Sequence, residues 1–146
     1  MRPPLDPLQE KIKDTLDAVL GVGWTLRNTT HKVSYDEKLG MGVYVLKFGD
    51  QQVASFELYP MVGCCGICVS TKATVDKAYR NRGIGALLNG LRIDIARYLG
   101  YGLLLCTDVE SNEYQRKILK RNGWMDLHKV VNPRTKNTIF ISAINL

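Results

Sequence analysis

The spacing of apolar residues divides the chain into helical and extended segments. Residues 5–20 place apolar side chains at helical intervals, and residues 84–99 carry a longer apolar stripe of the same period. A glycine follows each stripe, as is common where a helix ends. Ser111 or Asn112 can cap a third helix that runs to about Asn122. The pattern therefore predicts three helices.

Alternating or continuous apolar runs predict the strands. Residues 42–48 and 52–59 alternate on either side of a Gly-Asp turn, as in a β-hairpin. The alternation within residues 65–75 predicts a long strand, with the odd-numbered side chains from 67 onward on one face. Residues 103–107 form a short continuous apolar run, typical of a strand covered on both faces. Further strands are predicted at 24–26 and within 127–146, around a turn at 132–137.

This order of elements predicts the fold class. One helix precedes three or four strands, and then helix, strand, helix and two strands follow. We interpret it as an α/β sandwich in which a mixed sheet is flanked by helices. The length of 146 residues favours a single domain spanning residues 1–146.

Composition adds a location and a charge asymmetry. No run of 18 apolar residues occurs, and the amino terminus lacks the apolar core of a signal peptide, so we expect a cytoplasmic protein without a membrane span. The net charge is +6: residues 1–71 hold 7 Lys/Arg against 8 Asp/Glu, whereas residues 72–146 hold 13 against 6. A basic half can attract nucleic acid, an acidic protein or a phosphorylated cofactor, or it can be a solvated surface.

The four cysteines are interpreted as buried, reduced and structural. They are Cys64, Cys65, Cys68 and Cys106. A structural zinc site needs two ligand pairs, and a second pair is missing from this sequence. We therefore expect no metal.

Residues 75–88 contain the candidate chemistry, because a predicted strand passes there into a predicted helix through Arg80-Asn81-Arg82-Gly83-Ile84-Gly85-Ala86. Glycines at such a junction let the backbone approach a ligand, and the helix amino terminus favours anions. The arginines add forked donors for phosphate oxygens. A P-loop needs GxxxxGK[ST], which is absent, and Leu88 stands where a dinucleotide fingerprint needs its third glycine.

The segment resembles the acetyl-CoA-binding signature of the GNAT superfamily of N-acetyltransferases, [Q/R]-x-x-G-x-[G/A], here Arg80-x-x-Gly83-x-Gly85. Asn112 and Gly123-Trp124 are similar to the N-x10-G-F element of the same family. The resemblance covers residues 52–146 well and the first 50 residues only loosely.

The resemblance implies a mixed, mostly antiparallel sheet of six to seven strands that splays between the fourth and fifth strands. It also implies an enzyme that moves an acetyl or short acyl group from acetyl-CoA to an amine by direct attack. The pantetheine arm would pair with the backbone near Ala73 and Val75, with Asn112 beside it, and the glycine turn would hold the pyrophosphate. The implied cofactor-binding residues are Ala73, Val75, Arg80, Arg82, Gly83, Ile84, Gly85, Ala86 and Asn112.

Both of the proton carriers that many family members use are replaced here. Leu119 stands at the position of the usual tyrosine acid, and Val69 at that of a glutamate base. Asp108 and Thr71 are the catalytic candidates that we consider first, with Ser70 and Glu57 behind them. His31 and His128 receive no role. The loss of both carriers also fits a non-catalytic CoA-binding or regulatory module, which is the alternative function.

The acceptor stays open among nucleic-acid, protein and small-molecule amines. Part of the basic charge must serve the phosphates of CoA, so this charge does not by itself indicate nucleic acid. We expect a monomer or a homodimer.

Overall fold

The structure is a computed structural model that describes residues 7–30 and 39–146. In these residues the elements follow the predicted order closely. The helices are α1 (Pro7–Val19), α2 (Ile84–Tyr98) and α3 (Glu113–Arg121), with a short 3₁₀ turn η1 (Lys77–Tyr79) before α2. The strands are β1 (Trp24–Asn28), β2 (Gly42–Phe48), β3 (Gln51–Pro60), β4 (Ile67–Val75), β5 (Leu103–Val109), β6 (Met125–Val131) and β7 (Thr138–Asn145). Residues 5 and 6 of the first predicted helix lie outside the described residues.

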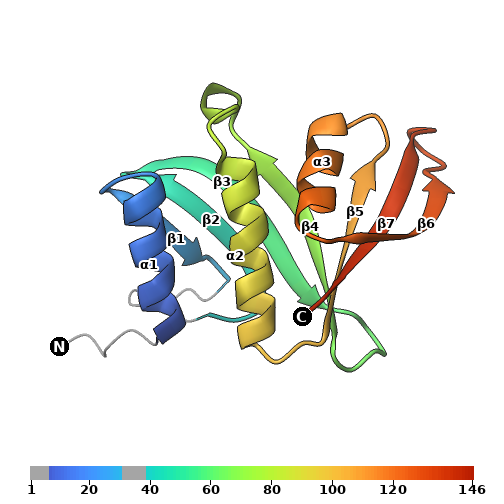
Figure 1. Ribbon diagram of the computed structural model, residues 1–146, viewed down its shortest axis with the longest axis horizontal. Helices are drawn as coiled ribbons and strands as arrows, with labels where there is room; N and C mark the ends of the chain where they lie inside the picture. The colour runs from blue at the N-terminus through green and yellow to red at the C-terminus, as the bar shows by residue number, and fades with distance from the viewer. Residues whose placement is uncertain (1–6, 31–38) are drawn as a thin grey trace.

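The seven strands form one mixed sheet in the order β1-β2-β3-β4-β5-β7-β6 (Figure 1). Every neighbouring pair is antiparallel except β4 and β5, which run parallel. A parallel pair needs a crossover connection, and α2 with its preceding turn supplies it. The mixed, mostly antiparallel sheet that the GNAT resemblance implies is thus confirmed.

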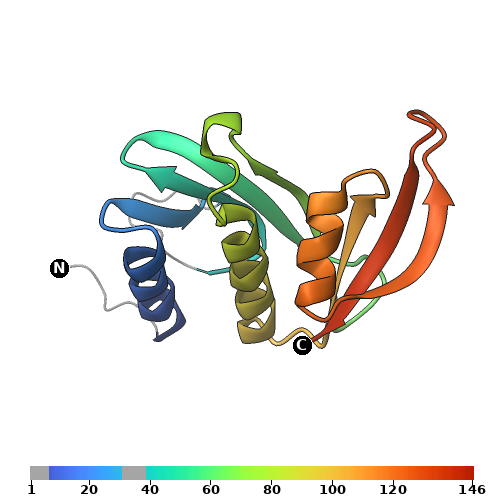
Figure 2. The same ribbon diagram turned by 45° about the horizontal axis from the view of Figure 1, so that its top comes forward.

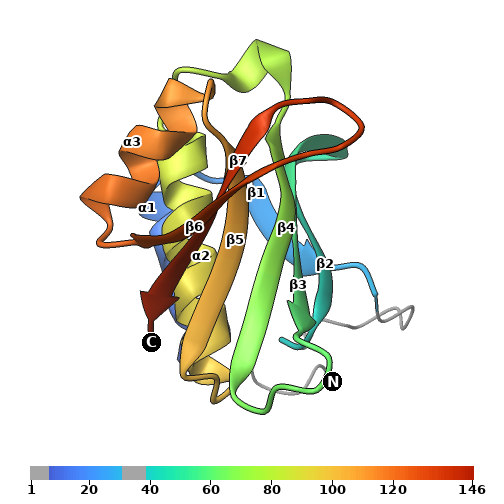
Figure 3. The same ribbon diagram turned by 90° about the vertical axis from the view of Figure 1, so that its right-hand side faces the viewer.

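The three described helices lie against the same face of the sheet (Figures 1 and 3). α1 packs against β1 and α2, and α2 packs against β3, β4 and α3. Turning the molecule shows α1, α2 and α3 standing in a row across the sheet (Figure 2). We call this side the helix face. No described helix covers the opposite side, which we call the helix-free face. None of the described helices is long and apolar enough to cross a membrane.

The main core lies between the sheet and the helix face. Phe56 and Leu58 alternate along β3 with more exposed neighbours and are completely buried. Tyr44 of β2 stacks on Phe56 with ring centroids 5.0 Å apart, and α2 contributes the fully buried Ile95. Burying one such side chain stabilises the fold by roughly 1.5–3 kcal/mol. Phe56 and Leu58 of β3 therefore point to the helix face.

The predicted face of β4 is wrong beyond residue 71. Residues 68 to 71 pair in register with β3, but the register shifts between Ser55 and Glu57, and Lys72 adopts a positive φ of 51°. Such a β-bulge adds a residue to one strand and reverses the alternation that follows. Val75 consequently pairs with buried Ala54 and packs against the core, on the side opposite to Val69.

Candidate functional site

The parallel ladder between β4 and β5 is short. It starts at Ile67 and Leu103 and ends at Ser70 and Cys106. β4 then continues to Val75 and β5 to Val109 without pairing to each other. The predicted splay between the fourth and fifth strands is confirmed. Beyond Ser70, the β5-facing edge of β4 has peptide groups that β5 does not use.

The turn after β4 leads directly into the amino terminus of α2. Asp76 caps the 3₁₀ turn through its side chain, which accepts the Ala78 N–H at 3.0 Å. Gly83 then adopts a left-handed conformation with φ 79°, and its carbonyl accepts the N–H of Leu87 at 3.1 Å. This is the first turn of α2, so the amides of residues 84–86 have no partner within the helix. They present an anion-binding end of a helix beside the free edge of β4.

Both signature arginines are exposed and have contacts within this turn. The Arg80 Nε atom donates to the Val75 carbonyl at 3.1 Å, so Arg80 helps to close the turn and engages one of the backbone groups expected to bind pantetheine. The Arg82 guanidinium lies 5.1 Å from the centre of the Tyr79 ring. Neither arginine forms an ion pair with a described carboxylate. Their remaining donors are available to a phosphate.

The second sequence element marks the two ends of α3. Asn112 caps the helix with its side chain, which accepts the Gln115 N–H at 3.2 Å. Gly123 has φ 82°, and the next N–H, of Trp124, bonds back to the Leu119 carbonyl at 3.1 Å. Left-handed glycines commonly end helices in this way. The predicted cap at Asn112 is confirmed, and the spacing between Asn112 and Gly123 is explained by the length of this helix.

Gly85 lies where α2 contacts α3. A Cβ atom built at Gly85 would lie 3.4 Å from Cδ1 of Ile118 and 3.7 Å from the Tyr114 ring. Both are ordinary van der Waals distances, so a small side chain would fit at this contact between α2 and α3. At Gly83, by contrast, a Cβ would meet nothing within 4 Å, so the backbone conformation is the constraint at that position.

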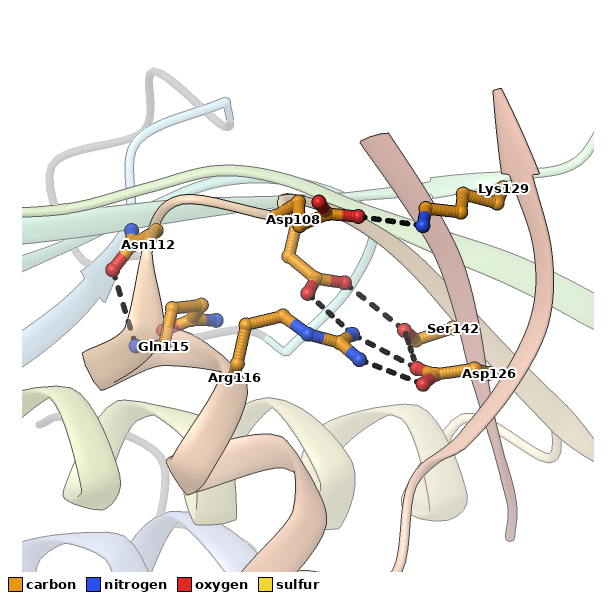
Figure 4. A network of polar contacts seen from close by, with 8 residues as sticks. Asp108, Asn112, Gln115, Arg116, Asp126, Lys129 and Ser142 are labelled. Atoms are coloured by element: carbon orange, nitrogen blue, oxygen red, sulfur yellow. Dashed lines mark hydrogen bonds and ion pairs between the residues drawn. The ribbon is translucent and has the colours of Figure 1, made fainter. Parts of the chain in front are cut away.

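Asp108 is held in a buried polar network on the helix face (Figure 4). Its side chain is 0% exposed and forms an ion pair with Arg116 of α3 at 2.7 Å. The Ser142 hydroxyl donates to its other oxygen at 3.0 Å. Arg116 also binds both oxygens of Asp126, at 2.8 and 2.6 Å. These hydrogen bonds raise the pKa of Arg116 and lower that of Asp126, each stabilising the charged form of its partner.

The comparisons with known proteins agree with this geometry. No protein-family model matches the sequence, and no curated protein matches it. Solved structures do match. Ard1 from Thermoplasma volcanium is 12% identical with a TM-score of 0.70, over 86% of this chain and 99% of that chain. A GNAT family acetyltransferase from Elizabethkingia anophelis with acetyl-CoA bound is 16% identical with a TM-score of 0.66, over 86% and 99%. IAA acetyltransferase from Bacillus cereus is 15% identical with a TM-score of 0.61, over 71% and 77%.

The chain has the fold of the GNAT acetyltransferases. At the two positions where the GNAT resemblance places proton carriers, the structure has apolar side chains. Leu119 is 2% exposed and belongs to the core, and Val69 is half-buried on the helix-free face. Thr71 lies on the same face, directly across from Glu57 of β3. Ser70 points instead to the helix face, where its hydroxyl accepts from Arg92 at 3.2 Å.

Arg92 is a buried cation that the sequence analysis missed. It is 3% exposed, it donates to Asn89 Oδ1 at 3.0 Å, and its guanidinium lies 5.0 Å from the centre of the Trp124 ring. Burial lowers its pKa by penalising the charged form. Its position four residues after buried Leu88 was the available signal, because side chains at that spacing share one face of a helix. Arg92 thus connects α2, on the helix face, to Ser70, the last residue of β4 that pairs with β5.

Two of the four cysteines are not buried as expected. Cys68 and Cys106 are buried, and burial raises the pKa of each thiol to about 11. Cys65 is exposed and Cys64 half-buried, because the chain reverses direction before β4 begins at Ile67. All four are free thiols. Within residues 7–30 and 39–146, no group of three or more His, Cys, Asp or Glu side chains could hold a metal.

Proposed function

We propose that this chain is an acetyl-CoA-dependent N-acetyltransferase, acting through one domain of 146 residues. One observation carries the proposal: the free amides of residues 84–86 adjoin the unpaired edge of β4 beyond Ser70. Free amides at a helix amino terminus can bind a pyrophosphate. The unpaired edge of a strand can pair with an extended arm that contains amide groups. The GNAT fold, seen with acetyl-CoA in the Elizabethkingia anophelis protein, supports the same function.

The residues present fit this cofactor. Gly83 is left-handed and has open space where its Cβ would lie, so a phosphate can approach the amides of α2, and the exposed Arg80 and Arg82 add positive charge. Acetyl-CoA would supply the activated acetyl group. The chain would bind the phosphates at residues 80–86, align the arm along Ala73 and Val75, and place Asn112 beside it. Such catalysis depends mainly on holding the thioester and the amine together.

The acceptor class stays open among small-molecule, protein and nucleic-acid amines. Residues 72–146 hold 13 Lys/Arg against 6 Asp/Glu, which would favour an anionic acceptor. A monomer and a homodimer are both compatible with the proposal.

Cofactor binding is tested by thermal unfolding with acetyl-CoA. At 100 times its dissociation constant, a ligand adds about 2.7 kcal/mol to the free energy of unfolding, which raises Tm by several degrees. Gly83→Val should abolish this shift, because a β-branched residue rarely adopts a φ near 79°. Gly49→Val is the matched control, since Gly49 also has positive φ and open surroundings but lies in the β2–β3 hairpin. A shift with ATP or NAD but not with acetyl-CoA would refute the proposal.

Turnover separates the enzyme from the alternative CoA-binding module. Thiol release from acetyl-CoA is measured with spermidine, a tetrapeptide with a free α-amino group and an adenine-containing oligonucleotide. Acetylation of any of these amines, confirmed by mass spectrometry, supports the enzyme. A protein that acetyl-CoA stabilises but that turns over none of them favours the module, in agreement with the apolar residues at positions 69 and 119.

A further inference from the structure

The proposed reaction needs a group that takes a proton from the attacking amine, and the GNAT positions for such a group are apolar here. At neutral pH most alkylamines are protonated, and only the neutral amine is a nucleophile. The following inference rests on the proposed function.

The described strands contain three carboxylates, and they divide between the two faces of the sheet. Asp108 of β5 and Asp126 of β6 both bind Arg116 of α3, so both are on the helix face. Glu57 of β3 lies between Phe56 and Leu58, which are completely buried beneath the helices. Because successive side chains of a strand point to opposite faces, Glu57 is on the helix-free face.

The helix-free face is also where an acceptor can approach the gap between β4 and β5. On the helix face, Arg116 connects α3 to β5 and β6, and Arg92 connects α2 to the last paired residue of β4. No described helix stands over the other side of this gap (Figure 3). An amine that reaches a thioester in the gap would therefore come from the side of Glu57.

Glu57 is positioned beside the point where the strands separate. Its partner in β4 is Thr71, the first residue beyond the last pair of the β4–β5 ladder. Its side chain is 15% exposed, so it is mostly shielded but still reaches solvent. The Tyr59 hydroxyl donates to Oε1 at 2.6 Å, and the Lys72 ammonium lies 3.7 Å from Oε2. The bulge at Lys72 is the reason that this ammonium lies next to Glu57.

We propose that Glu57 is the catalytic residue that accepts the proton of the acceptor ammonium, and that Tyr59 is a positioning residue that orients its carboxylate. Glu57 Oε2 takes one proton from the ammonium. The freed nitrogen lone pair then forms the C–N bond at the thioester carbonyl carbon, and the C–S bond breaks with its electron pair going to sulfur. The second nitrogen proton passes to the thiolate through water, and Glu57 returns its proton to solvent. The products are the acetylamide, free CoA and one proton.

The surroundings of Glu57 contain few other groups that titrate. Tyr59 is next to it in β3, and its hydrogen bond to Glu57 raises the pKa of Tyr59. Lys72 from β4 is the adjacent cation, with its side chain 77% exposed. The neighbour from β2 is Val43, and the partner from β4 is Thr71, neither of which is charged. Apart from Tyr59 and Lys72, the residues that neighbour Glu57 in the sheet are therefore uncharged.

The test compares Glu57→Gln, Glu57→Asp and Tyr59→Phe with wild type, using spermidine or the tetrapeptide, whichever is acetylated faster, because both amines are protonated near pH 7. Glu57→Gln should lower kcat/KM by about 10²–10⁴ at pH 7, the usual contribution of a general base. Its deficit should shrink as pH rises, because the amine loses its proton in solution. Glu57→Asp should recover part of the activity. Tyr59→Phe should lower kcat by up to about tenfold, the effect of losing the one hydrogen bond that orients the carboxylate.

The controls separate this inference from the proposed function. Acetyl-CoA should bind Glu57→Gln with a dissociation constant within twofold of wild type. Glu10→Gln, an exposed substitution in α1, should leave kcat/KM unchanged. A Glu57→Gln variant with kcat/KM within threefold of wild type at pH 7 would overturn the role of Glu57 while leaving the acetyltransferase intact. A wild-type protein that acetylates no amine would overturn the proposed function first, and this role with it.

Discussion

Asp108 and Glu57 lie on opposite faces of the same sheet, near the point where β4 and β5 separate, and their surroundings differ. Asp108 is completely buried and binds both Arg116 and Ser142. Glu57 reaches solvent and binds Tyr59 and the exposed Lys72. A buried, fully partnered carboxylate is poorly placed to exchange a proton with a substrate, whereas a carboxylate with one open side can do so.

The difference between these two carboxylates shows that position along the chain is a weak guide to which side chain can exchange a proton at the gap between β4 and β5. Asp108 directly follows the apolar run at residues 103–107, and for that reason it is the first candidate that the sequence offers. In the structure, Arg116 reaches from α3 to join β5, β6 and β7 through Asp108, Asp126 and Ser142. This burial favours a structural role for Asp108. Glu57 gains its place from the alternation of β3 and from its pairing with Thr71, just beyond the end of the β4–β5 ladder.

Asp108→Asn should give the largest change in stability. Removing one partner of a buried ion pair typically costs 3–5 kcal/mol, and Arg116 keeps Asp126, so we expect about 3 kcal/mol from denaturant unfolding. Asp94→Asn, a partly exposed substitution in α2, should change stability by less than about 0.5 kcal/mol. If Asp108→Asn is as stable as wild type but its kcat is lower by a factor of about 10²–10⁴, Asp108 would be the proton acceptor in place of Glu57.

Leu119→Tyr should have an intermediate effect. The substitution restores the residue that the GNAT resemblance expects, but Leu119 is 2% exposed within the core. Forcing a larger, polar side chain into a packed core typically costs 1–3 kcal/mol. Leu119→Met, which conserves volume, should cost less than about 1.5 kcal/mol and serves as the control. A Leu119→Tyr variant that is as stable as wild type and turns over faster would show that this position faces the thioester.

Local signals explain why most of the fold was predictable. The stripe of α2, the hairpin of β2 and β3 and the glycine turn at Gly83 each depend on neighbouring residues, and the structure has all of them. Asn112 and Gly123 mark the ends of α3 through capping, which is also local. The spacing of hydrophobic residues and the residue types at turns and helix ends are sufficient to predict these features.

The contacts around the gap were not predictable by the same means. Asp108 and Ser142 are 34 positions apart, and they meet only because β5 and β7 pair. The bulge at Lys72 turns Val75 to the core, although strict alternation predicts otherwise. Tertiary pairing, and not local propensity, decides both the bulge and the network.

The smallest expected effect concerns Asp126 and the response to acid. The hydrogen bonds from Arg116 lower the pKa of Asp126 in the folded protein below its ordinary value of about 3.9. A carboxylate of this kind stabilises the fold above its unfolded pKa, and this stabilisation is lost as pH falls through the folded pKa. Asp126→Asn removes the titrating group, so the urea midpoint of the variant should fall less steeply than that of wild type below about pH 4. At pH 7 the difference should be modest, because the Asp126 side chain is 39% exposed. Equal slopes in acid would show that Asp126 adds nothing to the network, and Asp108 alone would then hold Arg116 on the helix face.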